Sequence, residues 1–302
     1  MKQKIIAAAI ASTLAVPFAV QAEGDNTWYG RVNTGLQIKD MDGTTSDIRG
    51  YASRFGVKGS SDLGNGLSVI YQFEFAVDSD IANIANNNRV SSVGLSGSFG
   101  TVKLGKNWGA GSWANVGSPM SPHNVTGGQA YSGTFGNYRM ANSVQYSGGA
   151  GPVNYGVDVV IDGADTTSSG IDNWTLGGSW AAGGISVGAA YADNGDSDAM
   201  GAAVSWSSEN IGVVAGITTS EDDAGPEADG LMVRVNGAFG DAMTWSVVGN
   251  SLEDTAAGDT DSIAVNVTKN MGKGTALWME ADFVSSDSGD YDVLHVGIRK
   301  NF

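Results

Sequence analysis

Charged residues in this chain share short segments with apolar residues, and the two kinds alternate along each segment. Within residues 51–60, Phe55 and Val57 fall on one face of an extended chain, whereas Arg54 and Lys58 fall on the other. Fixed charges along one face attract or repel ions, which is a chemistry of selection rather than of bond making. The same alternation predicts that several basic side chains point inward, namely Arg31, Lys39, Arg54, Lys58 and Arg139.

Acidic residues take the same kind of position in other segments. In residues 66–78, Glu74 and Asp78 alternate with large apolar side chains such as Phe73 and Phe75. A charge on a lipid-facing surface would cost about 2–4 kcal/mol near the membrane midplane, so the inward position is favoured wherever the other face meets lipid. The acids predicted to point inward are Glu74, Asp78, Asp158, Glu280 and Asp282.

Bond-making chemistry has few candidates. The chain has no cysteine and two histidines, His123 and His295, and no pattern places either one beside a nucleophile or an orienting carboxylate. Clustered acids at 193–198 and 259–261 would suit Ca²⁺, but neither cluster completes a calcium-binding loop with a closing Glu. We therefore expect no enzyme, no cofactor and no metal site. There are two alternatives. One is a hydrolytic barrel enzyme that uses one of the histidines, and the other is a calcium-binding loop.

The composition excludes several other classes. Charged residues are 16% of the chain, and no run of 18 apolar residues occurs after residue 22, so a helical membrane bundle is excluded. The formal net charge of −16 makes a nucleic-acid partner unexpected. With 45 glycines and no period of three, the chain is rich in turns without being collagen-like.

Residues 1–22 have the pattern of a secretory signal peptide. Lys2 and Lys4 precede an apolar stretch, and Val20 and Ala22 form a small-x-small cleavage site. A single membrane anchor is the alternative, but the stretch lacks a basic flank on its far side. Cleavage would leave residues 23–302 as one domain with 14 basic and 32 acidic residues.

Alternation of apolar and polar residues recurs throughout the domain and predicts sixteen strands. Tight glycine-rich turns alternate with longer polar segments, for example 63–66 and then 79–88, which is typical of an up-and-down barrel. Every backbone amide in lipid needs a partner within the protein, so the sheet must close on itself. The predicted strands are 28–39, 51–60, 66–78, 89–99, 101–107, 139–147, 152–161, 173–182, 184–193, 198–208, 211–220, 229–239, 242–253, 260–271, 275–285 and 291–302.

Several segments together resemble the general diffusion porins of Gram-negative outer membranes. They are Tyr51–Gly59, Asp62–Leu67, Tyr71–Glu74, Val93–Trp108 and the C-terminal Leu294–Phe302. The resemblance covers the whole of residues 23–302. It implies a 16-stranded transmembrane β-barrel, a homotrimer, and a third loop, here Trp108–Tyr138, that folds into the lumen. It also implies that the second loop, here Ser79–Asn88, latches onto a neighbouring subunit.

The family keeps a ladder of basic residues on the wall opposite the third loop. Arg31, Arg54, Lys106 and Arg139 match those positions. Lys106 has the parity of Val102 and Leu104, so either a bulge turns it inward or Lys103 takes its place. The third loop contains no Asp or Glu, unlike the usual family pattern.

The resemblance implies a water-filled channel for passive diffusion of ions and small hydrophilic solutes. The acidic net charge suggests a weak cation preference. A substrate-selective porin with a saturable site for a sugar or an anion is the alternative. We expect the protein in the outer membrane of a Gram-negative cell, with membrane lipid and lipopolysaccharide as neighbours.

Overall fold

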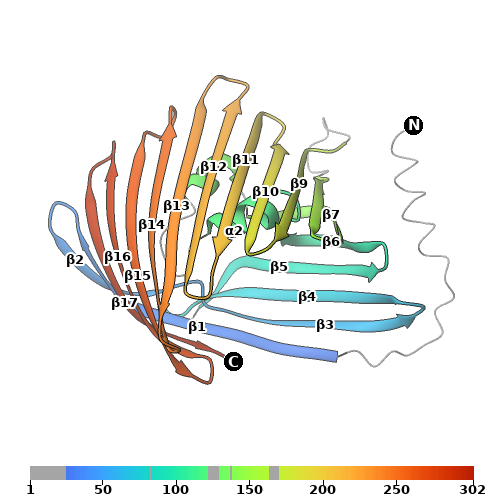
Figure 1. Ribbon diagram of the computed structural model, residues 1–302, viewed down its shortest axis with the longest axis horizontal. Coiled ribbons are helices and arrows are strands. Elements are labelled where there is room, and N and C mark those ends of the chain that lie inside the picture. The colour runs from blue at the N-terminus through green and yellow to red at the C-terminus, as the bar shows by residue number, and fades with distance from the viewer. Residues whose placement is uncertain (1–24, 82, 122–128, 137, 163–169) are drawn as a thin grey trace.

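The computed structural model describes residues 25–81, 83–121, 129–136, 138–162 and 170–302, and most of them are in strands (Figure 1). The strands are β1 (Asp25–Asp40), β2 (Thr44–Gly50), β3 (Arg54–Gly64), β4 (Leu67–Asp78), β5 (Asn83–Gly97), β6 (Gly100–Trp108), β7 (Arg139–Ala150), β8 (Val153–Val160), β9 (Asn173–Ala182), β10 (Ile185–Asp193), β11 (Ser197–Ser207), β12 (Ile211–Asp222), β13 (Glu227–Phe239), β14 (Met243–Asp254), β15 (Thr260–Gly272), β16 (Thr275–Ser286) and β17 (Tyr291–Asn301). The described residues between β6 and β7 form three short helical segments: η1 (Trp113–Gly117), α2 (Ser118–Met120) and α3 (Gln129–Phe135). Among the described residues, no helix is long and apolar enough to cross a membrane.

The strands form one closed antiparallel ring. From β3 onward each strand pairs with the next, and β17 pairs with β1 from Arg31↔Asn301 to Asp40↔Asp292. Backbone hydrogen bonds between Gly30 and Phe302 complete this seam, at 2.9 and 3.1 Å. Since β2 and β3 pair with successive halves of β1, they form one interrupted strand. The barrel is therefore a closed 16-stranded ring, and this prediction is confirmed.

Two predicted loops are shorter than expected. Residues 40–50, which lie between two predicted strands and were expected to form a polar loop, include residues 44–50, which pair with Thr34–Asp40 and lengthen the second predicted strand at its start, before Tyr51. The strand breaks at residues 51–53, where Ala52 has a φ of 51° and the Tyr51 amide donates to the Asn33 carbonyl at 2.8 Å. The segment predicted as the second loop, 79–88, is also largely strand, because β5 begins at Asn83.

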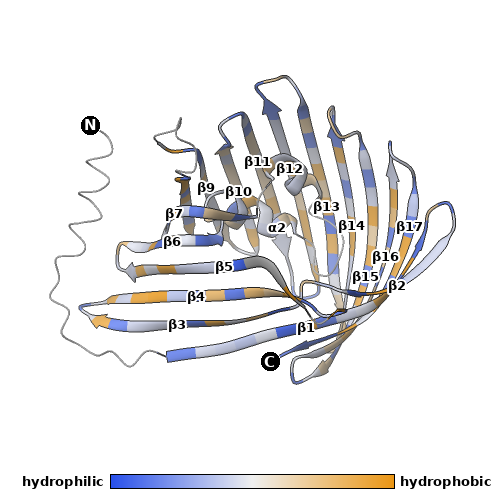
Figure 2. Ribbon diagram, turned by 180° about the vertical axis from the view of Figure 1, so that it is seen from behind, coloured by the Kyte–Doolittle hydropathy of each residue, from blue (hydrophilic) through white to orange (hydrophobic). Residues whose placement is uncertain are grey.

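Hydrophobic and hydrophilic residues alternate along the strands, as the striped colouring in Figure 2 shows. Large apolar side chains are exposed on the outer face, such as Phe73, Leu104 and Ile217. Polar side chains such as Asn33 and Glu280 are buried on the inner face. Exposed apolar side chains that recur from strand to strand in this way are typical of a surface that contacts a membrane.

The apolar core lies inside the ring rather than between sheets. We call residues 109–138 the inner loop, and its described residues carry η1, α2 and α3 against the inner faces of β9–β14 (Figures 1 and 2). Its side chains Val116, Met120 and Tyr131 are fully buried against small wall residues. The wall residues of this core are Ala190, Ala192, Ala199, Ala203, Val214, Met232, Val248 and Ala264.

Candidate functional site

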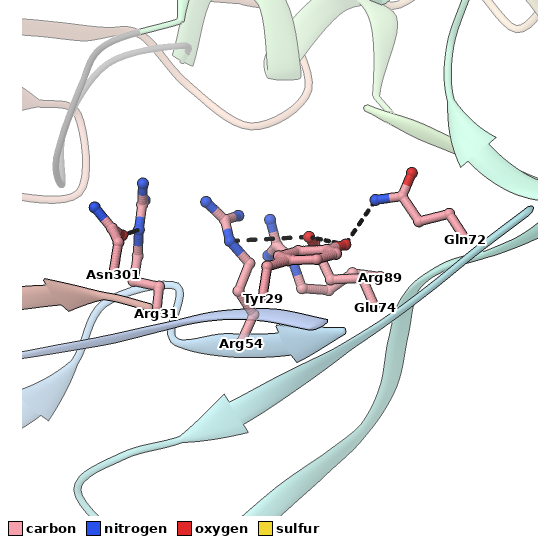
Figure 3. Close-up of polar contacts among 7 residues, drawn as sticks. All are labelled: Tyr29, Arg31, Arg54, Gln72, Glu74, Arg89 and Asn301. Atoms are coloured by element: carbon pink, nitrogen blue, oxygen red, sulfur yellow. Dashed lines mark hydrogen bonds and ion pairs between the residues drawn. The ribbon is translucent and has the colours of Figure 1, made fainter. Parts of the chain in front are cut away.

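Arginines from neighbouring strands gather on the inner face opposite the inner loop. Figure 3 shows Arg31 and Arg54 extending to the same side of their strands, with Arg89 and Glu74 beside Arg54. The Nε atom of Arg89 is 2.5 Å from Oε1 of Glu74, and that of Arg54 is 3.9 Å from Oε2. Arg31 donates instead to Oδ1 of Asn301, across the β1–β17 seam, at 3.0 Å.

This group extends to strands on either side. The charge of Arg31 is close enough to repel those of Arg54, Arg89 and Arg299, and the charge of Arg139 is close enough to repel those of Arg54 and Arg89. We call Arg31, Arg54, Arg89, Arg139 and Arg299 the basic wall.

Glu74 is the acidic partner within the basic wall. It is 5% exposed, and besides Arg54 and Arg89 it accepts a hydrogen bond from the Tyr29 hydroxyl at 3.0 Å. Gln72 donates to the same hydroxyl at 2.7 Å, so the carboxylate is held in a fixed position. One carboxylate among several guanidinium groups leaves the local charge clearly positive.

Arg89 was not identified from the sequence. Simple alternation gives it the parity of Ser91 and Val93, which is the lipid-facing parity. The β4–β5 pairing shifts here, because Glu74 pairs with Val90 but Phe75 pairs with Asn88. At this bulge Arg89 has no partner residue in the β4–β5 pairing, and its side chain reaches Glu74. Its signal in the sequence was a charge at a lipid-facing position, which is costly unless a bulge turns it inward.

Aromatic side chains connect the basic wall to the inner loop. The Arg139 guanidinium lies 4.7 Å from the ring centre of Trp108, and that of Arg89 lies 5.7 Å from it. Trp108 stacks on Trp113 of the loop at 4.9 Å between ring centres. These contacts place cations against aromatic faces and hold the loop root beside the arginines.

The predicted lysines lie beside this group rather than in it. Lys58 is on the inner face, with Nζ 5.7 Å from the Tyr29 ring centre, and it lines a groove with Gln72 and Lys103. Lys106 follows Gly105, where the β6–β7 register shifts, and its charge lies near that of Arg139. Lys103 lines the same groove as Lys58, on the inner face.

The predicted acids of β16 belong to a different cluster. Glu280 and Asp282 are each 2% exposed. Glu280 accepts from the Asn266 amide at 3.0 Å, and Asp282 lies 3.0 Å from Nε2 of His295. The other ring nitrogen of His295 is 2.9 Å from the Tyr51 hydroxyl.

This second cluster is a buried polar network in the wall. It includes the inward turn at Tyr51, whose ring packs edge-on against Trp278. Since His295 is enclosed between Tyr51 and Asp282, it has no exposed nitrogen for proton transfer to a solute. The other histidine, His123, lies outside the described residues.

The clustered acids were the candidates for a metal site. No three His, Asp or Glu side chains in the described part of the chain are placed to hold an ion, including the acids at 193–198 and 259–261. The acids of the first segment are engaged locally: Asp193 accepts from the Trp174 indole at 2.9 Å, and Asp198 accepts from the Tyr191 hydroxyl at 2.6 Å.

Comparison with known proteins agrees with this architecture. The solved structure of an anion-selective porin from Comamonas acidovorans superposes with a TM-score of 0.81 and 21% identity, over 93% of this chain and 100% of that one. The OmpF structure from Salmonella typhi superposes with a TM-score of 0.77 and 18% identity, over 92% and 97% of the two chains. At these identities the likeness concerns the fold.

Sequence relatives cover a shorter stretch. The major outer membrane protein P.IB of Neisseria gonorrhoeae is 37% identical over 115 residues, which is 35% of this chain and 32% of that protein. Outer membrane porin protein 32 of Delftia acidovorans is 34% identical over 114 residues, again 35% and 32%. The alignments thus span about a third of the length of these curated relatives.

The family model described as Gram-negative porin matches residues 7–289. Together with a closed barrel that is apolar outside and charged inside, and with relatives named as outer-membrane proteins, this match places the chain in the outer membrane as a member of the Gram-negative porin family.

Proposed function

We propose that the protein is a non-enzymatic, water-filled channel through which ions and small hydrophilic solutes diffuse passively, with a preference for small anions at the constriction. The basic wall is the observation that carries this proposal. Several arginines with one carboxylate among them face an inner loop whose sequence, 109–138, contains no Asp or Glu. An anion is therefore stabilised by nearby charges at the level where the loop narrows the lumen.

The preference for anions differs from the weak cation preference expected from net charge. Some exposed acids, such as Asp196 and Asp223, lie on connections between strands rather than on the inner wall. Charges separated by more than about 10 Å of 0.1 M salt solution are largely screened, so the charges nearest the ion path should decide its selectivity. The structural relative from Comamonas acidovorans is described as an anion-selective porin, which supports the same sign.

Reversal potentials across a planar bilayer in a KCl gradient test this proposal. The unmodified channel should show a reversal potential of the sign given by chloride permeation. The double variant Arg54→Gln/Arg89→Gln should move it toward the potassium value. Arg49→Gln is the matched control, because Arg49 is exposed and contacts Asp47 and Gln37 outside the basic wall.

The outcomes separate the candidates clearly. A reversal potential of the potassium sign in the unmodified protein would support the cation preference and overturn the proposal of anion preference. Failure of the refolded barrel to conduct at all would overturn the channel function itself.

A saturable anion site within the same channel is the second candidate, and the closely spaced guanidinium groups favour it. Arginine binds carboxylate and phosphate oxygens in pairs, so a divalent organic anion should bind more tightly than chloride. Block of chloride current that saturates with succinate concentration would support such a site. A strictly linear decrease would support simple diffusion.

We also propose a homotrimer in contact with lipid and lipopolysaccharide. The family resemblance and the broad apolar outer face support this assembly. Single-channel records that close in three equal steps would agree with it, and single-step closures would contradict it.

A further inference from the structure

Asp158 is a charged side chain that the channel function does not use as a pore charge. It is on the inner face of β8, but it is 0% exposed, because the root of the inner loop covers it. Oδ1 accepts from the Ala110 amide at 3.0 Å, and Oδ2 accepts from the Gly111 amide at 2.8 Å. Two wall side chains complete its shell: Gln145 of β7 and Thr175 of β9 each donate at 2.6 Å.

This arrangement couples the burial of a charge to the position of the loop. A buried carboxylate is tolerated only when hydrogen-bond donors surround it, and half of these donors are loop amides. Lifting residues 110–111 off the wall would remove both amides at once. The charge of Asp158 therefore opposes any displacement of the loop root.

Glycines in the wall allow the loop backbone to approach so closely. A Cβ on Gly156 would lie 2.3 Å from the Ala110 carbonyl oxygen, and one on Gly177 would lie 2.3 Å from that of Gly111. On β10, a Cβ on Gly188 would lie 2.0 Å from the Asn115 carbonyl oxygen. Glycine inside a strand often marks such a backbone approach. The loop backbone thus lies directly on three neighbouring strands.

The next part of the loop depends on this root. Asn115 donates its side-chain amide to the carbonyl oxygens of Ala110 at 3.0 Å and Gly111 at 2.8 Å, so η1 is tied to the residues that Asp158 holds. Trp113 lies between Gly111 and Asn115 in the chain and stacks on Trp108. Trp108 in turn faces Arg139 of the basic wall. Movement at Asp158 would consequently reach the constriction.

We infer that Asp158 is a positioning residue that locks the root of the inner loop onto β7–β9, and that it thereby sets the aperture and the current stability of the channel. The inference rests on the proposed channel function. It assigns Asp158 a role distinct from that of an acid that attracts cations in the lumen. Replacing Asp158 should change how often the loop moves and should have little effect on which ion is preferred.

Single-channel recording of Asp158→Asn and Asp158→Ala tests the inference. Charge-assisted hydrogen bonds are among the stronger ones in proteins, so their loss should make loop excursions at least about tenfold more frequent, seen as added open-channel noise and substates. The reversal potential should stay near that of the unmodified channel. Asp62→Asn is the matched control, since Asp62 is exposed at the β3–β4 turn and accepts from the Gly64 amide.

A disulfide provides an independent check on the loop. A Cβ on Gly133 of α3 would lie 3.2 Å from Cγ of Leu252 on β14, the position that a sulfur would take in a Leu252→Cys variant. The chain has no cysteine of its own, so Gly133→Cys/Leu252→Cys forms the only possible bridge. Added to Asp158→Ala, the oxidised bridge should suppress the noise, and dithiothreitol should restore it.

The outcomes also separate this inference from the channel proposal. If the unmodified protein conducts and Asp158→Ala is equally quiet, the inference is overturned while the channel function stands. If Asp158→Ala shifts the reversal potential without noise and the bridge changes nothing, Asp158 is a pore charge and the inference is again overturned. Should Asp158→Ala fail to refold, Thr175→Val, which removes one donor to Asp158, should still raise the noise.

Discussion

The inner wall of this barrel consists of two unlike halves. Along β8–β14 many inward positions hold small or apolar residues, such as Gly177, Ala203 and Met232, and the inner loop packs on them, although Asp158 and Arg234 there are charged. Along β15–β17 and β1–β7 charged and amide side chains are more frequent at these positions, such as Arg54, Glu74 and Asn266, although Ala264 and Trp278 also lie there. The strands alternate in the same way in both halves, so the difference lies in the residues and not in the backbone.

The contrast teaches that one half of the ring acts as the folding core and the other half acts on the solute. A ring with water along its whole inner face has no interior apolar core of its own. Here the loop supplies one on one side and leaves the opposite side free to carry charge. Substitutions in the two halves should therefore fail in different ways.

The largest effect is expected in the charged half, at His295. His295→Ala removes the partner that lies 3.0 Å from the buried Asp282 carboxylate, which should cost about 3 kcal/mol of unfolding free energy. Urea unfolding in detergent, followed by tryptophan fluorescence, measures this loss. The double variant His295→Ala/Asp282→Ala should recover part of it. A double variant less stable than the single one would mean that the pair does not act as a unit.

A smaller loss is expected in the loop-covered half, at Gly188. Gly188→Ala places a Cβ 2.0 Å from the Asn115 carbonyl oxygen, and overpacking of this kind costs about 1–3 kcal/mol. The loop should shift, so mean conductance should change along with stability. Gly249→Ala is the matched control, because nothing lies within 4 Å of a Cβ built there. Equal behaviour of the two variants would show that the loop does not rest on the wall.

Tyr131 gives a pH-dependent test of the same half. Burial raises the pKa of Tyr131, whose hydroxyl donates to Ser112 at 3.0 Å. Docking of the inner loop on the barrel wall therefore favours the neutral phenol. Docking is fully present below the pKa of an exposed tyrosine, about 10, and is lost as pH rises through the raised pKa. Tyr131→Phe should cost about 1 kcal/mol and should abolish any rise of channel noise in alkali. Noise that rises equally in both proteins would assign the effect to another group.

The smallest effect is expected outside both halves. Asp196→Asn and Asp223→Asn remove exposed acids from the connections around β11, where the Asp223 amide donates to the Asp196 carbonyl at 2.9 Å. In about 0.1 M salt their charge should be screened from the constriction, and the reversal potential should not change. A shift as large as that of the basic-wall variants would show that the outer charges govern selectivity.

Much of this architecture could be predicted from the sequence, because alternation is a local pattern. Residues 66–78 alternate clearly, and the structure has β4 at Leu67–Asp78. Positions where the backbone departs from a regular strand could not be found in this way. A bulge turns Arg89 inward, and an interruption turns Tyr51 inward, because pairing with a neighbouring strand decides both.

The contact between the inner loop and the wall could not be predicted for a different reason. Gly156, Gly177 and Gly188 have inward parity in consecutive strands, which is a signal that the sequence does contain. The loop residues that these glycines contact, Ala110, Gly111 and Asn115, lie far earlier in the chain, so no local pattern reveals the contact. Asp158 is likewise predicted to point inward, whereas the four donors around it come from three separate segments.

The hydrogen bonds between Gly30 and Phe302 have a consequence for assembly. Strand β1 can pair with β17 only after β17 has been synthesised. Until then the sheet has two unpaired edges. Contacts that join opposite ends of a chain form slowly, and exposed strand edges invite pairing with other molecules. The chain must therefore be kept from aggregating until its last segment arrives, and a truncation of β17 should leave an open sheet rather than a smaller pore.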